Sequence, residues 1–96
     1  MIIIAGTLTL AAADRERYLA AVGGVAPAAR RAPGCLDFVQ TADPVDPERI
    51  VIFERWESDE DLERFRSSGA PEEQSEVPPL QDADVRKYRI ASVEEP

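Results

Sequence analysis

Histidine is absent from this 96-residue chain, and cysteine and tryptophan occur once each, as Cys35 and Trp56. A zinc site needs several histidine or cysteine ligands, so zinc is not expected. Catalytic triads that depend on histidine are excluded as well. A single cysteine cannot form an intramolecular disulfide, which fits a reducing cytoplasm. We interpret Cys35 as a small buried hydrophobic residue, because a catalytic thiolate usually has a cationic partner such as histidine.

Positive charge is also scarce, with 11 Lys and Arg against 19 Asp and Glu and a net charge of −8. A phosphate surface would repel such a chain, so neither nucleic acid nor a membrane is expected as a partner. The apolar start lacks the basic segment of a signal peptide, and no stretch approaches the ~20 apolar residues of a membrane span. The length predicts a single domain, 1–96, of modest stability.

The alternation of apolar residues, interrupted by turn residues, predicts four strands. The first strand is apolar on both faces, which is typical of a strand that is covered on both sides. The connection Ala42–Arg49 is too short for a crossover helix, so the second and third strands should form an antiparallel hairpin. The predicted strands are Ile2–Leu10, Leu36–Thr41, Arg49–Glu57 and Val85–Val93.

Two helices are expected between these strands. Asp14 should cap the first helix, and Gly23-Gly24 together with Pro27 predict a kink or a break within residues 22–28. Ser58 should cap the second helix, and three acids in its first turn serve the helix start, where the helix dipole favours them. The acidic, proline-containing stretch 70–84 is expected to form a loop, with one helical turn near 72–76. The tail 94–96 should fray.

The element order β-α-β-β-α-β is the ferredoxin-like arrangement, an α+β fold in which both helices cover one face of an antiparallel sheet. The other face of this sheet would be bare and apolar. A second copy of the chain should cover it, which predicts a symmetric homodimer through the sheet face.

Five segments together resemble the antibiotic biosynthesis monooxygenase-like (ABM) domain. They are IIIAGTL, YLAAV, APGCLDF, ADPVDPERI and FERWES, and they span roughly residues 1–69. The resemblance implies a dimeric α+β barrel, in which each subunit keeps a pocket between its sheet and its helices. Some members of the family oxidise aromatic phenols or anthrones with O2 and without metal or flavin. Others oxidise quinols, handle small signalling metabolites or degrade haem.

Three positions differ from the patterns that the resemblance brings with it. The anthrone-oxidising branch has an asparagine four residues before the tryptophan, where this chain has Ile52. Many members have a histidine about nine residues after it, where Phe65 stands. The haem-degrading branch also has an asparagine on the first strand, and Thr7 occupies that position. The resemblance therefore disfavours haem degradation and implies no cofactor and no metal.

Glu54 and Trp56 are two residues apart on the third predicted strand, so their side chains should point to the same side. If that side lies under the helices, desolvation raises the pKa of Glu54 and makes it a candidate general base for a phenol proton. In the alternative, Glu54 forms a salt bridge with Arg86, Arg89 or a partner residue, which would lower its pKa. Trp56 either packs only in the core or also lines a substrate cavity.

These observations predict a cytoplasmic, cofactor-independent monooxygenase that acts on a small aromatic, phenolic or quinol-type compound. The alternatives are a non-catalytic small-molecule binding or regulatory dimer and a related dimeric-barrel isomerase with a carboxylate base. The catalytic candidates are Glu54, Trp56 and Arg86. The candidates for substrate contact are Thr7, Tyr18, Ile52, Leu62, Phe65 and Tyr88.

Overall fold

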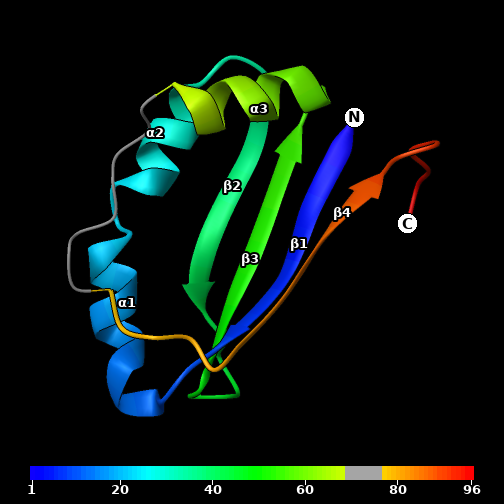
Figure 1. The fold of residues 1–96 in the computed structure, drawn as a ribbon. Coiled ribbons are helices and arrows are strands. Elements are labelled where there is room, and N and C mark those ends of the chain that lie inside the picture. Colours follow the sequence, from blue (N-terminus) through cyan, green and yellow to red (C-terminus); the bar gives the residue numbers. More distant parts are fainter. Residues whose placement is uncertain (69–76) are drawn as a thin grey trace.

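A computed structural model describes residues 1–68 and 77–96 of the chain. Four strands form one antiparallel sheet in the order β2-β3-β1-β4. The helices α1, α2 and α3 all lie on the same face of the sheet (Figure 1). The predicted ferredoxin-like α+β fold is therefore confirmed. In chain order the elements are β1 (Ile2–Thr9), a 3-10 turn η1 (Ala12–Asp14), α1 (Arg15–Ala21), α2 (Val25–Arg31), β2 (Cys35–Ala42), β3 (Arg49–Trp56), α3 (Asp59–Ser67) and β4 (Asp82–Arg89).

The helices do not cover the sheet evenly. α2 and α3 lie at one end of the sheet, and α1 lies at the other end (Figure 1). β4 is the strand at the edge next to β1, and all eight of its residues are exposed. The well-covered part of the sheet therefore consists of β1, β2 and β3.

The expected break in the first helix is present. Residues 22–24 separate α1 from α2, and Pro27 lies in the first turn of α2, where its missing amide proton costs no helical hydrogen bond. Asp14 precedes α1 but makes no capping bond with its side chain, in contrast to the prediction. Its carboxylate instead accepts a hydrogen bond from Arg17 at 2.8 Å.

The start of α3 is held as predicted and is joined to the turn before β2. Ser58 Oγ accepts a hydrogen bond from the backbone amide of Asp61 at 3.1 Å, which caps the helix. Gly34 has a positive φ of 83°, and a Cβ atom at this position would overlap the side chain of Asp61. Glycine is therefore required both for the backbone conformation and for the close approach of α3.

Two strand predictions need correction. β4 begins at Asp82 rather than Val85 and ends at Arg89 rather than Val93, so the end of the predicted loop 70–84 belongs to the strand. The predicted helical turn near 72–76 lies outside the described residues. Regular alternation in the predicted strand Leu36–Thr41 puts Leu36 on the same face as Phe38. A register shift between Cys35 and Asp37 instead places Leu36 at an irregularity of β2, where it is exposed.

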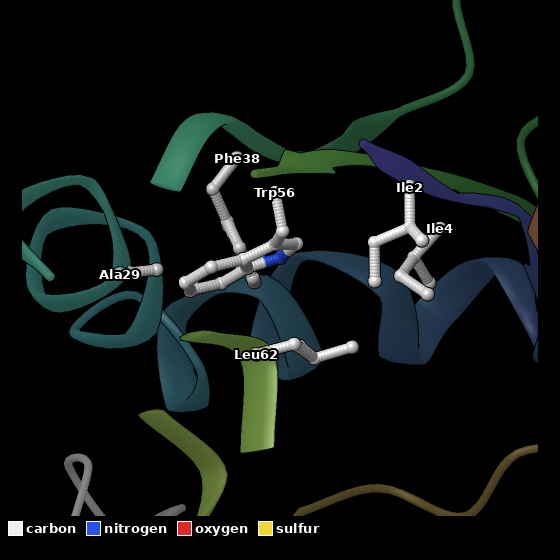
Figure 2. Close-up of a cluster of buried hydrophobic side chains, with 6 residues drawn as sticks. All are labelled: Ile2, Ile4, Ala29, Phe38, Trp56 and Leu62. Atoms are coloured by element: carbon white, nitrogen blue, oxygen red, sulfur yellow. The ribbon is translucent and has the colours of Figure 1, made fainter. Parts of the chain in front are cut away.

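Two clusters of buried side chains fill the layer between the sheet and the helices. The first lies under α2 and α3 and contains Ile2, Ile4, Ala29, Phe38, Trp56 and Leu62. In Figure 2 the indole of Trp56 lies between Ala29 on one side and Ile2 and Ile4 on the other. The second cluster contains Leu8, Leu10, Tyr18, Val22 and Ile50.

The opposite face of the sheet carries apolar side chains that no described element of the chain covers. Ala5 of β1 pairs with Phe53 of β3, which pairs with Val39 of β2, so the three apolar side chains lie in one row across this face, and the row continues to Arg86 of β4. Phe53 and Val39 are among the exposed large hydrophobic residues. We call the sheet surface around this row the open face.

Candidate active site

A carboxylate and an indole meet inside the first cluster. The indole Nε1 of Trp56 donates a hydrogen bond of 2.9 Å to Oε1 of Glu54, and both side chains are buried. The two residues alternate with Arg55 along β3, so they share the face of the sheet that carries the helices. The predicted common orientation of Glu54 and Trp56 is therefore observed.

Two phenylalanine rings lie on the side of Trp56. The ring of Phe65, on α3, lies 5.5 Å from the indole of Trp56 with an interplanar angle of 32°. Phe65 also makes an edge contact with Phe38 of β2, with the ring centroids 6.5 Å apart. Leu62 of α3 belongs to the same cluster, and Figure 2 shows its side chain on the helix side of the indole. Aromatic and apolar side chains thus pack against the indole that donates its hydrogen bond to Glu54.

Burial raises the pKa of Glu54, because the charged form loses its hydration. The hydrogen bond from Trp56 and the positive charge of Arg66 on α3 act in the opposite direction but are smaller. The alternative of a salt bridge to Arg86 or Arg89 does not occur within the chain. Arg86 pairs with Asp84, and Arg89 pairs with Asp59. The role of Glu54 as a general base stays a prediction.

Cys35 lies beside this pair and is only half-buried, whereas the sequence predicted a buried residue. It pairs with Trp56 across β2 and β3 and packs against the first cluster. Burial raises the pKa of its thiol, and the nearby carboxylates of Glu54 and Asp37 add to the effect. The thiol therefore stays protonated near neutral pH and is a weak nucleophile.

Three of the predicted site residues lie on the other side of the sheet. On β4, Arg86 pairs with Ala5 and Tyr88 pairs with Ile3, and both partners alternate with the buried Ile2 and Ile4 of β1. Thr7 lies two residues from Ala5 on β1 and therefore also points to the open face. The structure does not bring Arg86, Tyr88 or Thr7 together with Glu54.

The other predicted residues lie on the helix side but not all at one point. Leu62 and Phe65 contact the first cluster around Trp56. Tyr18 belongs to the second cluster, and Ile52 packs against that cluster from β3. Glu54, Trp56, Leu62 and Phe65 therefore form the compact candidate site, and Tyr18 and Ile52 lie towards the other end of the layer.

The basic residues of β4 that share the side of Glu54 are Lys87 and Arg89, and neither is among the predicted site residues. Lys87 pairs with Ile4, and Ile4 pairs with Glu54 on its other side. Both sides of this strand carry basic residues, so only the pairing register reveals which of them face the helices.

The side chains leave no opening at Trp56 itself. Trp56 is 0% exposed, Leu62 is 3% exposed and Glu54 is 8% exposed. A ligand can therefore touch the indole only after some of the side chains that pack around it have moved. The predicted substrate cavity stays a prediction.

The comparison with protein families decides the family. The model of the family described as antibiotic biosynthesis monooxygenase (ABM) matches residues 1–76, which is most of the chain. This chain belongs to the ABM family. The resemblance of the five sequence segments is thereby confirmed. No protein with a curated description matches the chain.

Solved structures show the same fold. The Pseudomonas aeruginosa protein PA3566 is 32% identical, with 94% of this chain and 93% of that chain covered and a TM-score of 0.60. A candidate antibiotic biosynthesis monooxygenase from Deinococcus radiodurans is 18% identical, with coverages of 99% and 97% and a TM-score of 0.76. The haem degrader MhuD from Mycobacterium tuberculosis, solved with two haems in its active site, is 17% identical, with coverages of 99% and 100% and a TM-score of 0.67.

This ABM chain does not offer the usual means of holding haem. It contains no histidine, so no imidazole is available as an axial ligand to iron. Among residues 1–68 and 77–96, no group of three or more His, Cys, Asp or Glu side chains could hold a metal ion. In the same part of the chain, no helix is long and apolar enough to cross a membrane.

Proposed function

We propose that this ABM protein is a cofactor-independent monooxygenase that acts on a small aromatic, phenolic or quinol-type compound. The observation that carries the proposal is the buried carboxylate of Glu54, which accepts a hydrogen bond from Trp56 beside the ring of Phe65. Its raised pKa brings a carboxylate closer to the range in which general bases work near neutral pH. The family membership supports an oxygenation over other reactions of acidic C–H or O–H groups.

The chemistry needs only the substrate, O2 and one base. Glu54 removes a proton from the hydroxyl or from an activated CH2 group of the substrate, and the resulting anion is electron-rich enough to transfer electrons to O2. At a CH2 centre the balance is CH2 + O2 → C=O + H2O, so the substrate supplies all four electrons that O2 accepts. The apolar wall around Glu54 excludes water and keeps the anion reactive.

The protein acts as a cytoplasmic homodimer in this proposal. The open face places Phe53, Val39 and Ala5 next to one another on a surface that no described element covers, and a second copy would bury them. The candidate site lies on the opposite side of the sheet. Dimerisation through the open face therefore leaves α3 free to move.

Oxygen uptake in the presence of anthrones, naphthols and quinols tests the function directly. Glu54→Gln should lower kcat by about 100-fold or more, because a neutral amide cannot accept the proton, and should leave ligand affinity within a few-fold. Glu57→Gln removes an exposed carboxylate three positions along the chain and serves as the control. Turnover that requires Glu54 but consumes no O2 would instead identify an isomerase. Binding of these aromatics without any turnover would identify a binding module.

A further inference from the structure

The first residue of α3 is bound to two cations of β4. The carboxylate of Asp59 accepts hydrogen bonds from Lys87 Nζ at 2.8 Å and from Arg89 Nη1 at 2.8 Å, and Arg89 Nη2 lies 3.4 Å from it. The two cations hold the pKa of Asp59 well below its usual range, so the carboxylate is ionised at neutral pH. We call these three residues the clasp.

The register places the clasp beside the candidate site. Lys87, Ile4 and Glu54 form one row across β4, β1 and β3, and Arg89, Ile2 and Trp56 form the next row. All six side chains point to the helix side of the sheet. Because neighbouring strands lie 4.7–4.9 Å apart, Lys87 is about 10 Å from Glu54 along its row. The floor between the two charged groups consists of isoleucine.

The helix that covers the site also supplies the anion of the clasp. α3 carries Asp59 at its first turn, and it carries Leu62 and Phe65 over Trp56. A displacement of the whole of α3 away from the sheet would therefore uncover Trp56 and also draw Asp59 away from Lys87 and Arg89. The two cations then face the newly opened space without a counter-charge. The clasp is solvent-exposed, so breaking it costs little.

We propose that Lys87 and Arg89 form a specificity subsite for an anionic group of the ligand, and that this group takes the place of the Asp59 carboxylate when α3 opens. The proposal rests on the proposed function, because it places the rest of the ligand at Glu54 and Trp56. The ligand class is an aromatic of two or more rings, with a hydroxyl group at one end for Glu54. A carboxylate at the other end reaches the cations. Asp59 is thus an internal stand-in for the ligand carboxylate.

A matched pair of compounds tests the subsite. 2-Naphthol carries only the hydroxyl group, whereas 6-hydroxy-2-naphthoate adds a carboxylate at the opposite end of the same two rings. Isothermal titration calorimetry should show that the naphthoate binds to the native protein about ten-fold more tightly, because charge-assisted hydrogen bonds form to the two cations. Lys87→Gln should reduce this preference to about two-fold or less without changing the affinity for 2-naphthol. The conservative variant Lys87→Arg should retain most of the preference for the naphthoate over 2-naphthol.

Two further variants sharpen the test. Asp59→Asn should strengthen naphthoate binding by a few-fold, because the internal competitor is weakened. Arg17→Gln removes a cation from a comparable exposed ion pair on α1 and should have no effect. Equal affinity for the two compounds, or an equal effect of Lys87→Gln and Arg17→Gln, would overturn the subsite. If 2-naphthol still binds in a manner that depends on Trp56 and Glu54, the proposed function survives that result. If neither compound binds, both proposals are wrong.

Discussion

The indole Nε1 of Trp56 and Oε1 of Glu54 are 2.9 Å apart. Among the described residues, Glu54 is the one buried charged side chain, and this hydrogen bond joins it to the buried Trp56. A buried carboxylate is expensive unless it is hydrogen-bonded or neutralised. This pair therefore combines two properties, since the same contact that stabilises Glu54 also positions it against the aromatic layer.

Replacement of Trp56 by Phe tests the structural half of this relationship. The variant loses the N–H donor and part of the ring, which leaves Glu54 without its partner and a cavity beside Phe65. We expect the free energy of unfolding to fall by about 2–4 kcal/mol in urea denaturation. Combined with Glu54→Leu, the effects should be non-additive by about 1 kcal/mol. Strict additivity in this double-mutant cycle would show that the hydrogen bond contributes nothing.

The raised pKa of Glu54 predicts a pH dependence of stability. The ordinary value for this group is 4.5, and burial raises the pKa in the folded state, so between the two values the folded chain binds more protons than the unfolded chain. The free energy of unfolding contributed by Glu54 is therefore fully present below pH 4.5 and is lost as the pH rises through the folded pKa. Each unit of upward shift corresponds to about 1.4 kcal/mol.

The measurement is the difference in urea midpoint between the native protein and Glu54→Gln from pH 4 to pH 8. Glu54→Gln should gain stability relative to the native protein as the pH rises, since its amide never charges. Glu57→Gln alters an exposed carboxylate and should follow the native curve. A difference that stays constant with pH would mean that Glu54 titrates normally and is a poor candidate for the base.

Gly6 allows β4 to lie close against β1. A Cβ atom at this position would overlap the carbonyl oxygen of Asp84 and would lie 2.6 Å from the Cα of Val85. Gly6→Ala should therefore displace the centre of β4 and lower the free energy of unfolding by about 2–3 kcal/mol. Gly23→Ala is the matched control, because its Cβ would come no closer than 3.2 Å to Ala20. Hydrogen exchange should show faster exchange confined to the β1–β4 ladder in Gly6→Ala.

Some features of the sequence determine the local structure more strongly than others. Strong local signals are the alternation in β1, the short loop between β2 and β3 and the glycine pair after α1. The predictions drawn from all three are confirmed. β4 has no such signal, because Val85 and Lys87 on one side are no more apolar than Arg86 and Tyr88 on the other. Which residues of β4 face the helices therefore depends on how the strand pairs with β1. For this reason Arg86 and Tyr88 are among the predicted site residues, whereas Lys87 and Arg89, which share the side of Glu54, are not.

The same dependence on pairing explains the irregularity in β2. Leu36 looks like the regular neighbour of Phe38 in the sequence, but the sharp turn at Gly34 and the contact of that turn with Asp61 on α3 fix where β2 enters the sheet. A tertiary contact thus overrides the local alternation. Fold class was accessible from local patterns, whereas the composition of the site required the register.

The open face yields the last prediction, which concerns assembly. Phe53 lies at its centre, between Val39 and Ala5, and is 36% exposed in the single chain. If the proposed homodimer forms through this face, Phe53→Arg should convert it to a monomer in light scattering at micromolar concentration, because each subunit would bury an added guanidinium group in the interface. Val45→Arg, at a loop residue that is 89% exposed, should remain dimeric. If the native protein already scatters as a single chain, the open face is not a dimer interface.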